Sequence, residues 1–246
     1  MDRYNEFAVF YDELMNDFDY EEWGNYIEKI FEKYNIDPRN ILEMACGTGS
    51  LTYYLARKRY NVIGFDVSSD MLSKAYEKLR PFKNVMLLEQ DMVNFEINKK
   101  FDSILSICDS INYIIDKDKL YKCFQNVYNH LDNNGVFVFD INSYYKLKEI
   151  IGNNTFVEDR EDIFYTWQNE FDDIDNVCTF YLTFFKNKGD NLYHRFDEEH
   201  MEKAYRVEEI KEILKNIGFA KIDYFDAFSF EPINEKSERI NFVAIK

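Results

Sequence analysis

A glycine-containing turn is the segment whose residue types and spacing best suit ligand chemistry. Gly47 and Gly49 lie in the stretch Glu-Met-Ala-Cys-Gly-Thr-Gly-Ser, residues 43–50, between a short apolar run and a helical pattern. A glycine has no Cβ, so a ligand can approach its backbone closely, and the first turn of the helix offers free N–H groups to an anionic group. Asp66 ends the next apolar run and is suited to accept hydrogen bonds from both hydroxyls of a ribose. Together these residues predict a site for a nucleotide cofactor.

The same pattern also fits a plain structural turn or a nicotinamide cofactor. A Gly-x-Gly turn can simply be a tight connection between a strand and a helix. A nicotinamide cofactor suits a glycine turn followed by an acid, but its fingerprint G-x-G-x-x-G has a third glycine where this chain has Thr52. The dinucleotide fingerprint is incomplete, which argues against a nicotinamide oxidoreductase.

The elements that must position these residues alternate between strands and helices. Apolar runs predict strands, and apolar residues at helical spacing predict the helices between them. Strands separated by helices form a parallel sheet with right-handed crossovers, so we expect an α/β fold with a doubly wound, seven-stranded, mostly parallel, Rossmann-like sheet. The predicted strands span residues 41–45, 61–66, 85–89, 101–108, 135–141, 219–228 and 239–245, and the predicted helices span 51–59, 69–79, 117–131 and 207–216.

One region departs from this alternation and predicts an antiparallel β insertion after the fifth strand. It contains three long runs of β character, at 163–171, 177–185 and 191–205, separated by turn sequences rich in Asp, Asn, Lys and Gly. Apolar and aromatic residues at helical spacing predict a helix near the N-terminus. We therefore expect an N-terminal helical cap at 1–37, a cofactor-binding core at 38–152 and 206–246, and the insertion at 153–205.

Five motifs in the right order resemble those of class I S-adenosylmethionine-dependent methyltransferases. Residues 41–52 resemble the first motif of that family, in its variant with Ala-x-Cys-Gly-Thr-Gly, and Ala45 and Ser50 stand where its fullest form has glycines. The other four motifs fall at residues 66–72, 90–92, 108–113 and 131–139. The resemblance covers residues 38–142 well and residues 205–219 moderately, and it implies S-adenosylmethionine as the cofactor.

The resemblance also implies roles for individual residues in holding the cofactor. Asp66 would hold the ribose, Met71 would pack on the adenine, Asp91 would accept from its amino group, and the backbone of Met92 would read the ring edge. N-terminal tyrosines close over the cofactor in the small-molecule members that act on glycine or amino sugars, and the pattern around Tyr11 is similar. The residues that would surround the methionine part are Glu43, Ala45, Gly47, Gly49 and, through its carbonyl, Cys108.

The residues after the fourth strand are the candidates for the methyl-acceptor site. Asp109, Asn112 and Tyr113 follow that strand at the edge of the sheet where ligands bind in open α/β folds. An acceptor amine must lose a proton, and Asp109 or a histidine of the insertion, His200, is a candidate base. In amino-sugar N-methyltransferases a similar insertion forms part of the substrate pocket or a dimer interface, which makes Arg195 a candidate for substrate binding and leaves a homodimer open.

The composition narrows the substrates and the compartment. The net charge of −16 repels phosphate backbones and anionic membranes, so nucleic acid and membrane partners are disfavoured. The chain also lacks the Asp/Asn-Pro-Pro-aromatic motif of DNA adenine methyltransferases after the fourth strand. Four cysteines without a C-x-x-C pair or zinc-ligand spacing predict no metal site and suit a reducing cytosol. No basic leader or long apolar run precedes or interrupts the chain, so we expect a cytoplasmic protein.

The function predicted from these observations is transfer of a methyl group from S-adenosylmethionine to a nitrogen or oxygen of a small polar metabolite. A regulatory protein that binds S-adenosylmethionine without catalysis would show the same cofactor motifs. An acidic methyltransferase acting on a basic protein is a further alternative.

Overall fold

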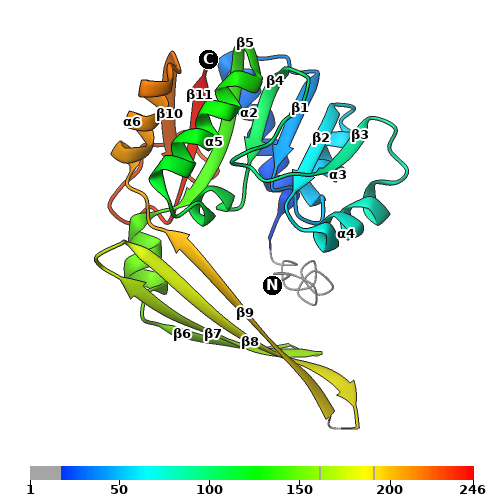
Figure 1. The fold of residues 1–246 in the computed structure, drawn as a ribbon, viewed down its shortest axis with the longest axis vertical. Coiled ribbons are helices and arrows are strands. Elements are labelled where there is room, and N and C mark those ends of the chain that lie inside the picture. Colours follow the sequence, from blue (N-terminus) through cyan, green and yellow to red (C-terminus); the bar gives the residue numbers. More distant parts are fainter. Residues whose placement is uncertain (1–17, 161, 191) are drawn as a thin grey trace.

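The structure is a computed structural model that describes residues 18–246 apart from positions 161 and 191. A seven-stranded sheet forms its core, in the order β10-β11-β5-β4-β1-β2-β3 (Figure 1). Strands β1 to β5 run parallel, and β11 is antiparallel to both of its neighbours. The strands are β1 (Asn40–Met44), β2 (Asn61–Asp66), β3 (Val85–Glu89), β4 (Phe101–Ser106), β5 (Leu131–Asn142), β10 (Lys221–Asp226) and β11 (Arg239–Ile245).

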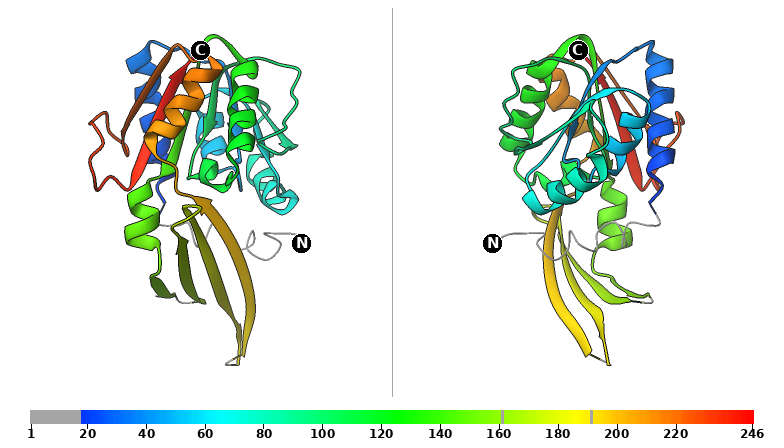
Figure 2. Two further views of the ribbon diagram at one scale, coloured as in Figure 1. Left: turned by 60° about the vertical axis from the view of Figure 1, so that its left-hand side comes forward. Right: turned by 90° about the vertical axis from the view of Figure 1, so that its right-hand side faces the viewer.

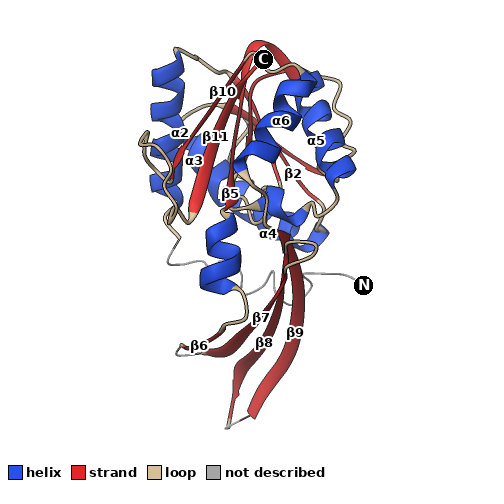
Figure 3. Ribbon diagram, turned by 90° about the vertical axis from the view of Figure 1, so that its left-hand side faces the viewer, coloured by secondary structure: helices blue, strands red, loops and turns tan. Residues whose placement is uncertain are grey.

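Helices cover both faces of this sheet because successive strand residues point to opposite sides (Figures 2 and 3). Ile41 and Val138 pack in one apolar cluster with α2 and α3, whereas Leu42 and Phe139 pack in a second cluster with α5 and α6. The predicted doubly wound α/β fold is confirmed. The helices are α2 (Tyr20–Tyr34), α3 (Ser50–Arg57), α4 (Ser69–Leu79), α5 (Lys117–His130) and α6 (Val207–Ile217).

Helix α2 is the described part of the predicted N-terminal cap. The Asp19 side chain caps it by accepting from the Glu22 backbone N–H at 2.9 Å, and the helix ends at Asn35 in the left-handed conformation. Its buried face, which includes Trp23 and Ile27, packs against α3 and the sheet. No helix within 18–246, with 161 and 191 left aside, is long and apolar enough to cross a membrane.

A second, four-stranded antiparallel sheet extends from the carboxyl ends of the core strands (Figures 1 and 2). It confirms the predicted insertion after the fifth strand, and adds one strand, β6, that the sequence did not predict. A short π-helix at Lys146–Ile151 connects β5 to this sheet. The Gly152 N–H donates to the carbonyl of Leu147, five residues back, at 2.9 Å, which is the hydrogen-bond spacing of a π-helix. The strands pair in the order β6-β7-β8-β9 and span Thr155–Asp159, Ile163–Asp172, Val177–Gly189 and Leu192–Lys203.

The order of the core strands reverses at β1, which lies between β4 and β2. Crossovers leave the sheet in opposite directions at such a point, so a crevice opens beyond the carboxyl ends of the two central strands. The glycine turn follows β1 and the predicted acceptor residues follow β4. The topology therefore brings the two groups of predicted residues to one crevice.

Candidate active site

A cavity of about 450 Å³ lies between the carboxyl ends of the core strands and the second sheet. One wall comes from the ends of β1, β2 and β4, and the opposite wall comes from one face of β7, β8 and β9. Among the residues predicted to form the site, ten line this cavity: Glu43, Ala45, Gly47, Asp66, Met71, Met92, Cys108, Asp109, Tyr113 and His200.

The two glycines of the turn after β1 both have left-handed backbone, which glycine adopts readily, but their surroundings differ. Gly47 has a φ of 54°, and a Cβ added there would meet no atom within 4 Å, so this position faces open space beside the cavity. Gly49 has a φ of 76°, but a Cβ there would lie 2.7 Å from the Leu79 side chain of α4. Gly49 does not line the cavity and is required by packing, whereas Gly47 leaves room for a ligand.

Two acids hold this turn and the end of β2. Asp66 accepts from the backbone N–H of Gly47 at 2.8 Å and from that of Ser68 at 2.9 Å, and burial raises its pKa against the effect of these bonds. Glu43 is buried and accepts from the Thr52 hydroxyl at 2.6 Å. Burial raises the pKa of Glu43 to about 8. Thr52, which replaces the third glycine of a dinucleotide fingerprint, therefore anchors an acid of the cavity.

The predicted adenine contacts divide between the cavity and the surface. Met71 and Met92 line the cavity. Asp91 is exposed, and its carboxylate accepts from the Val93 backbone N–H at 2.7 Å, which closes a local turn. The structure thus leaves Asp91 beside the cavity lining, and its role toward adenine stays a prediction.

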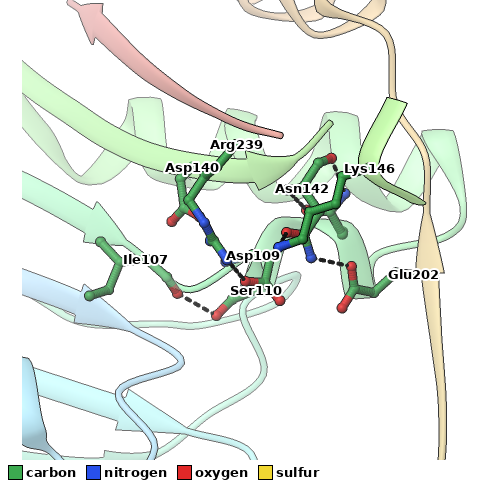
Figure 4. A network of polar contacts seen from close by, with 9 residues as sticks. Ile107, Asp109, Ser110, Asp140, Asn142, Lys146, Glu202 and Arg239 are labelled. Carbon is green, nitrogen blue, oxygen red and sulfur yellow. Dashed lines mark hydrogen bonds and ion pairs between the residues drawn. The ribbon is translucent and has the colours of Figure 1, made fainter. Parts of the chain in front are cut away.

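A sharp turn after β4 carries Cys108 and Asp109 into the cavity. Both have left-handed backbone, with φ of 60° and 56°, which explains why β4 stops at Ser106, earlier than predicted. Two bonds fix Asp109: its N–H donates to Asp140 at 3.0 Å, and its carboxylate accepts from the Arg239 guanidinium at 2.7 Å (Figure 4). Arg239 also bonds Asp140. Such strained backbone persists only where surrounding bonds hold it.

A second polar group joins the end of β5 to β9. The Asn142 side chain donates to the Glu202 carboxyl at 2.8 Å and accepts from the Lys146 ammonium at 3.0 Å (Figure 4). Asn112 is fully buried, and its amide donates to the backbone carbonyls of Asn142 and Lys203 and accepts from the Asn142 N–H. Asn112 therefore braces the site from behind, and the structure does not bring it to the cavity surface.

Glu202 is a buried carboxyl group that lines the cavity. Only 2% of its surface is exposed. Burial first, and the negative charge of Asp109 second, raise the pKa of Glu202 well above its usual range. Burial also lowers the pKa of the nearby Lys146. A carboxyl and an amine held in such surroundings are typical of functional sites.

The second sheet presents an aromatic face to the cavity. His200 is buried there, and its ring lies edge-on to the Tyr113 ring at 5.9 Å between centroids. Arg195 sits on the same strand at odd spacing from His200, so it points to the opposite face, where it pairs with Asp197 at 2.9 Å with 61% of its side chain exposed. The structure does not bring Arg195 to the cavity. The other aromatic residues of the cavity wall are Tyr165, Trp167, Phe180 and Phe184.

The sequence analysis missed Asn142, Lys146, Glu202 and Arg239, which also line the cavity. The sequence held a signal for Glu202, which follows His200 by two residues on the same strand. Alternate residues of a strand share a face, so the two side chains lie on the same side of the sheet. Tyr11 lies outside the described residues. In the described part of the chain, no group of three or more His, Cys, Asp or Glu side chains is arranged so that it could bind a metal ion.

A Rossmann-like crevice with a glycine turn, an acid after β2 and a second wall from the antiparallel sheet is typical of a nucleotide-cofactor enzyme. Comparison with known proteins narrows the class. Residues 41–135 match the methyltransferase domain family Methyltransf_25. The chain is 36% identical to YqeM of Bacillus subtilis (strain 168), which bears a methyltransferase name, over 99% of this chain and 97% of that protein. A crystal structure of an S-adenosylmethionine-dependent methyltransferase from Clostridium acetobutylicum ATCC 824 is 43% identical, covers 98% of both chains and has a TM-score of 0.89.

The fold extends to more distant enzymes. DesVI of Streptomyces venezuelae is 19% identical over 97% of this chain and 96% of its own, with a TM-score of 0.79. At this level of identity the similarity shows a shared fold and nothing more. The chain itself belongs to the S-adenosylmethionine-dependent methyltransferases, as the two closer relatives show, and it is an enzyme with S-adenosylmethionine as its cofactor.

Proposed function

We propose that the protein transfers the methyl group of S-adenosylmethionine to a nitrogen or oxygen atom of a small polar metabolite. The observation that carries this proposal is the cavity with two unlike walls, one built from the cofactor motifs and the other from the aromatic face of the second sheet. Its volume of about 450 Å³ lies in the range of sites for small molecules. A long polymer would need an open groove with complementary charge, and the net charge of −16 does not suit a nucleic acid.

The core wall would hold the cofactor. The open space beside Gly47 gives room for the methionine part, with Glu43 and the Cys108 turn on either side. Asp66 would hold the ribose, and Met71 with Met92 would enclose the adenine. The cofactor supplies an activated methyl group, so these residues need only bind and orient it.

The second wall would hold the acceptor. Tyr113 and His200 meet there, and Asp109 faces the same space from the β4 turn. The apolar rings exclude water, and the polar groups can align an acceptor atom with the methyl carbon. Asp109 or His200 would assist an acceptor that must lose a proton. Arg195 on the outer face belongs to the surface through which a homodimer would form, if the insertion serves as an interface.

The test is a screen for turnover with wild type and Asp66→Ala. Each protein is incubated with S-adenosylmethionine and panels of small amines, alcohols, phenols and basic peptides, and S-adenosylhomocysteine and methylated product are measured by mass spectrometry. We expect product from a small acceptor with wild type and a large loss with Asp66→Ala. Product from basic peptides alone would support a protein substrate, and cofactor binding without turnover on any panel would favour the regulatory alternative. The compartment follows from the same proposal: a cytoplasmic metabolite suits a chain whose four cysteines are all free.

A further inference from the structure

Two carboxyl groups face the same part of the cavity from different elements. Asp109 stands on the turn after β4, and Glu202 lies near the end of β9. Each has its own polar anchor, because Arg239 holds Asp109 at 2.7 Å and Asn142 holds Glu202 at 2.8 Å (Figure 4). Their placement is therefore fixed by separate bonds.

The charges in this group do not balance when every acid is ionised. Asp109, Asp140 and Glu202 contribute three negative charges, and Arg239 and Lys146 contribute two positive ones. Asp140 has no exposed surface and Glu202 has 2%, so an excess buried charge is unfavourable. One proton on the group, or one positive charge in the adjacent cavity, restores neutrality. Arg239 pairs with both Asp109 and Asp140, whereas the anchor of Glu202 is the neutral amide of Asn142. This arrangement places the proton on Glu202, and burial with the nearby charge of Asp109 raises its pKa in the same direction.

The other titratable groups packed around Glu202 are Cys178, His200 and, through Lys146, Glu238. Cys178 lies opposite Glu202 in the β8–β9 register, and burial raises the pKa of its thiol to about 12, which keeps it neutral. His200 shares the same face of β9, two residues away. Glu238, which precedes Arg239 in the sequence, favours the charged form of Lys146 through its negative charge, so it adds to the excess of negative charge.

We propose that Glu202, paired with Asp109, is the proton acceptor of the reaction: it is protonated in the free enzyme, releases its proton when the positive sulfonium enters the cavity, and takes up a proton from the methyl acceptor. This inference rests on the proposed function of the cavity, and it assigns the proton transfer to Glu202 in place of Asp109 or His200. It adds a residue that the sequence motifs do not contain, and it assigns the second sheet a chemical role besides shape.

Charge and atoms balance through one turnover. In the transfer the bond between sulfur and the methyl carbon breaks, its electron pair stays on sulfur, and the acceptor atom forms the new bond. The positive charge moves from sulfur to the acceptor atom, which then gives its proton to the Glu202 carboxylate. Glu202 thus returns to its protonated state at the moment when the ligand beside it becomes the neutral thioether. Asp109 stays paired with Arg239 throughout.

The test compares the binding of two ligands that differ only by the methyl group and its charge. S-adenosylmethionine and S-adenosylhomocysteine are titrated calorimetrically from pH 6 to 8.5 into wild type, Glu202→Gln and the control Glu199→Gln. Glu199 lies on the same strand but is exposed on the opposite face. The positive sulfonium lowers the pKa of the ligand's own amino group, so the ratio of the two Kd values is compared between wild type and each variant. The difference in the pH dependence of that ratio reports Glu202.

In wild type, relative to Glu202→Gln, the preference for S-adenosylmethionine should grow by up to about tenfold per pH unit, because at high pH no proton has to be displaced. Glu199→Gln should follow wild type. An equal pH dependence in wild type and Glu202→Gln would overturn the proposal while leaving the proposed function in place. No binding of either ligand to wild type would overturn the proposed function as well.

A measurement on wild type alone covers the case in which Glu202→Gln does not fold. Titration at pH 7 in two buffers with different heats of ionisation gives the protons released per ligand bound. We expect S-adenosylmethionine to release more protons than S-adenosylhomocysteine, and equal release for both ligands would refute the role of Glu202.

Discussion

The two glycines of the turn after β1 should respond in opposite ways to the same substitution. In Gly47→Ala the new methyl group meets no protein atom within 4 Å and projects into open space beside the cavity, at a φ of 54°. In Gly49→Ala it lies 2.7 Å from the Leu79 side chain, at a φ of 76°. The first change therefore affects ligand space, and the second affects packing between the turn and α4.

The structure sets the size of each effect. A left-handed backbone at a residue with a Cβ is unfavourable by about 1–2 kcal/mol, so both variants should lose that much. Gly49→Ala adds an overpacking term of about 1–3 kcal/mol, which brings its total loss to about 2–5 kcal/mol. In Gly47→Ala the methyl group takes space from the cofactor, and we expect its Kd for S-adenosylmethionine to rise at least about tenfold, or about 1.4 kcal/mol.

Urea denaturation and calorimetric titration of both variants make the comparison. Gly47→Ala should be the more stable variant and the weaker binder. Gly49→Ala should be the less stable variant and should bind the cofactor within a few-fold of wild type at a temperature where it is folded. If Gly47→Ala bound S-adenosylmethionine as wild type does, the cofactor would not approach the backbone at this turn, and the reasoning would be refuted.

Three further predictions concern the brace, the outer face and the buried acid. Asn112→Ala should lower the free energy of unfolding by about 2–3 kcal/mol in urea, because the Asn142 N–H and two carbonyls lose their buried partner, and a smaller loss would mean that water replaces it. Arg195→Ala should change stability by about 0.5 kcal/mol or less and leave cofactor binding unchanged, because its ion pair is exposed, and weakened binding would place it in the site after all. Burial raises the pKa of Glu43 from an ordinary value near 4.5 to about 8, so its contribution to stability falls as the pH rises between these values. Glu43→Gln should remove that dependence, and the stability of wild type relative to this variant, measured in urea from pH 5 to 8, should decline by up to about 1.4 kcal/mol per pH unit; parallel curves would contradict the burial argument.

The core of the fold was predictable because its signals are local. Apolar runs between helical patterns indicate a parallel sheet, and the turn around Gly47 with Asp66 after the next strand indicates a cofactor crevice. The early end of β4 was not predictable, since the left-handed backbone at Cys108 and Asp109 depends on bonds from β5 and β11. A pattern that is local in sequence cannot report a turn held by distant strands.

The side of the cavity proposed to hold the acceptor was less predictable for a related reason. Asn142, Lys146, Glu202 and Arg239 come from three separate segments, and none stands in a motif. Whether Arg195 reaches the cavity depends on which face of β9 points inward. The alternation of that strand fixes the answer only once one inward residue is known, and the structure supplies it.

The hydrogen bonds that Asn112 makes have a consequence for the evolution of this protein. Its side chain bonds to Asn142 where the chain leaves the core and to Lys203 where the chain returns, so the two crossing points lie side by side. Everything between them is one continuous stretch that carries most of the second-sheet wall of the cavity, while the residues proposed to hold the cofactor lie outside it. Genetic exchange at two points would therefore replace the wall proposed to hold the acceptor and leave the proposed cofactor site intact. With the proposed function, such an exchange gives one cofactor-binding core a new substrate.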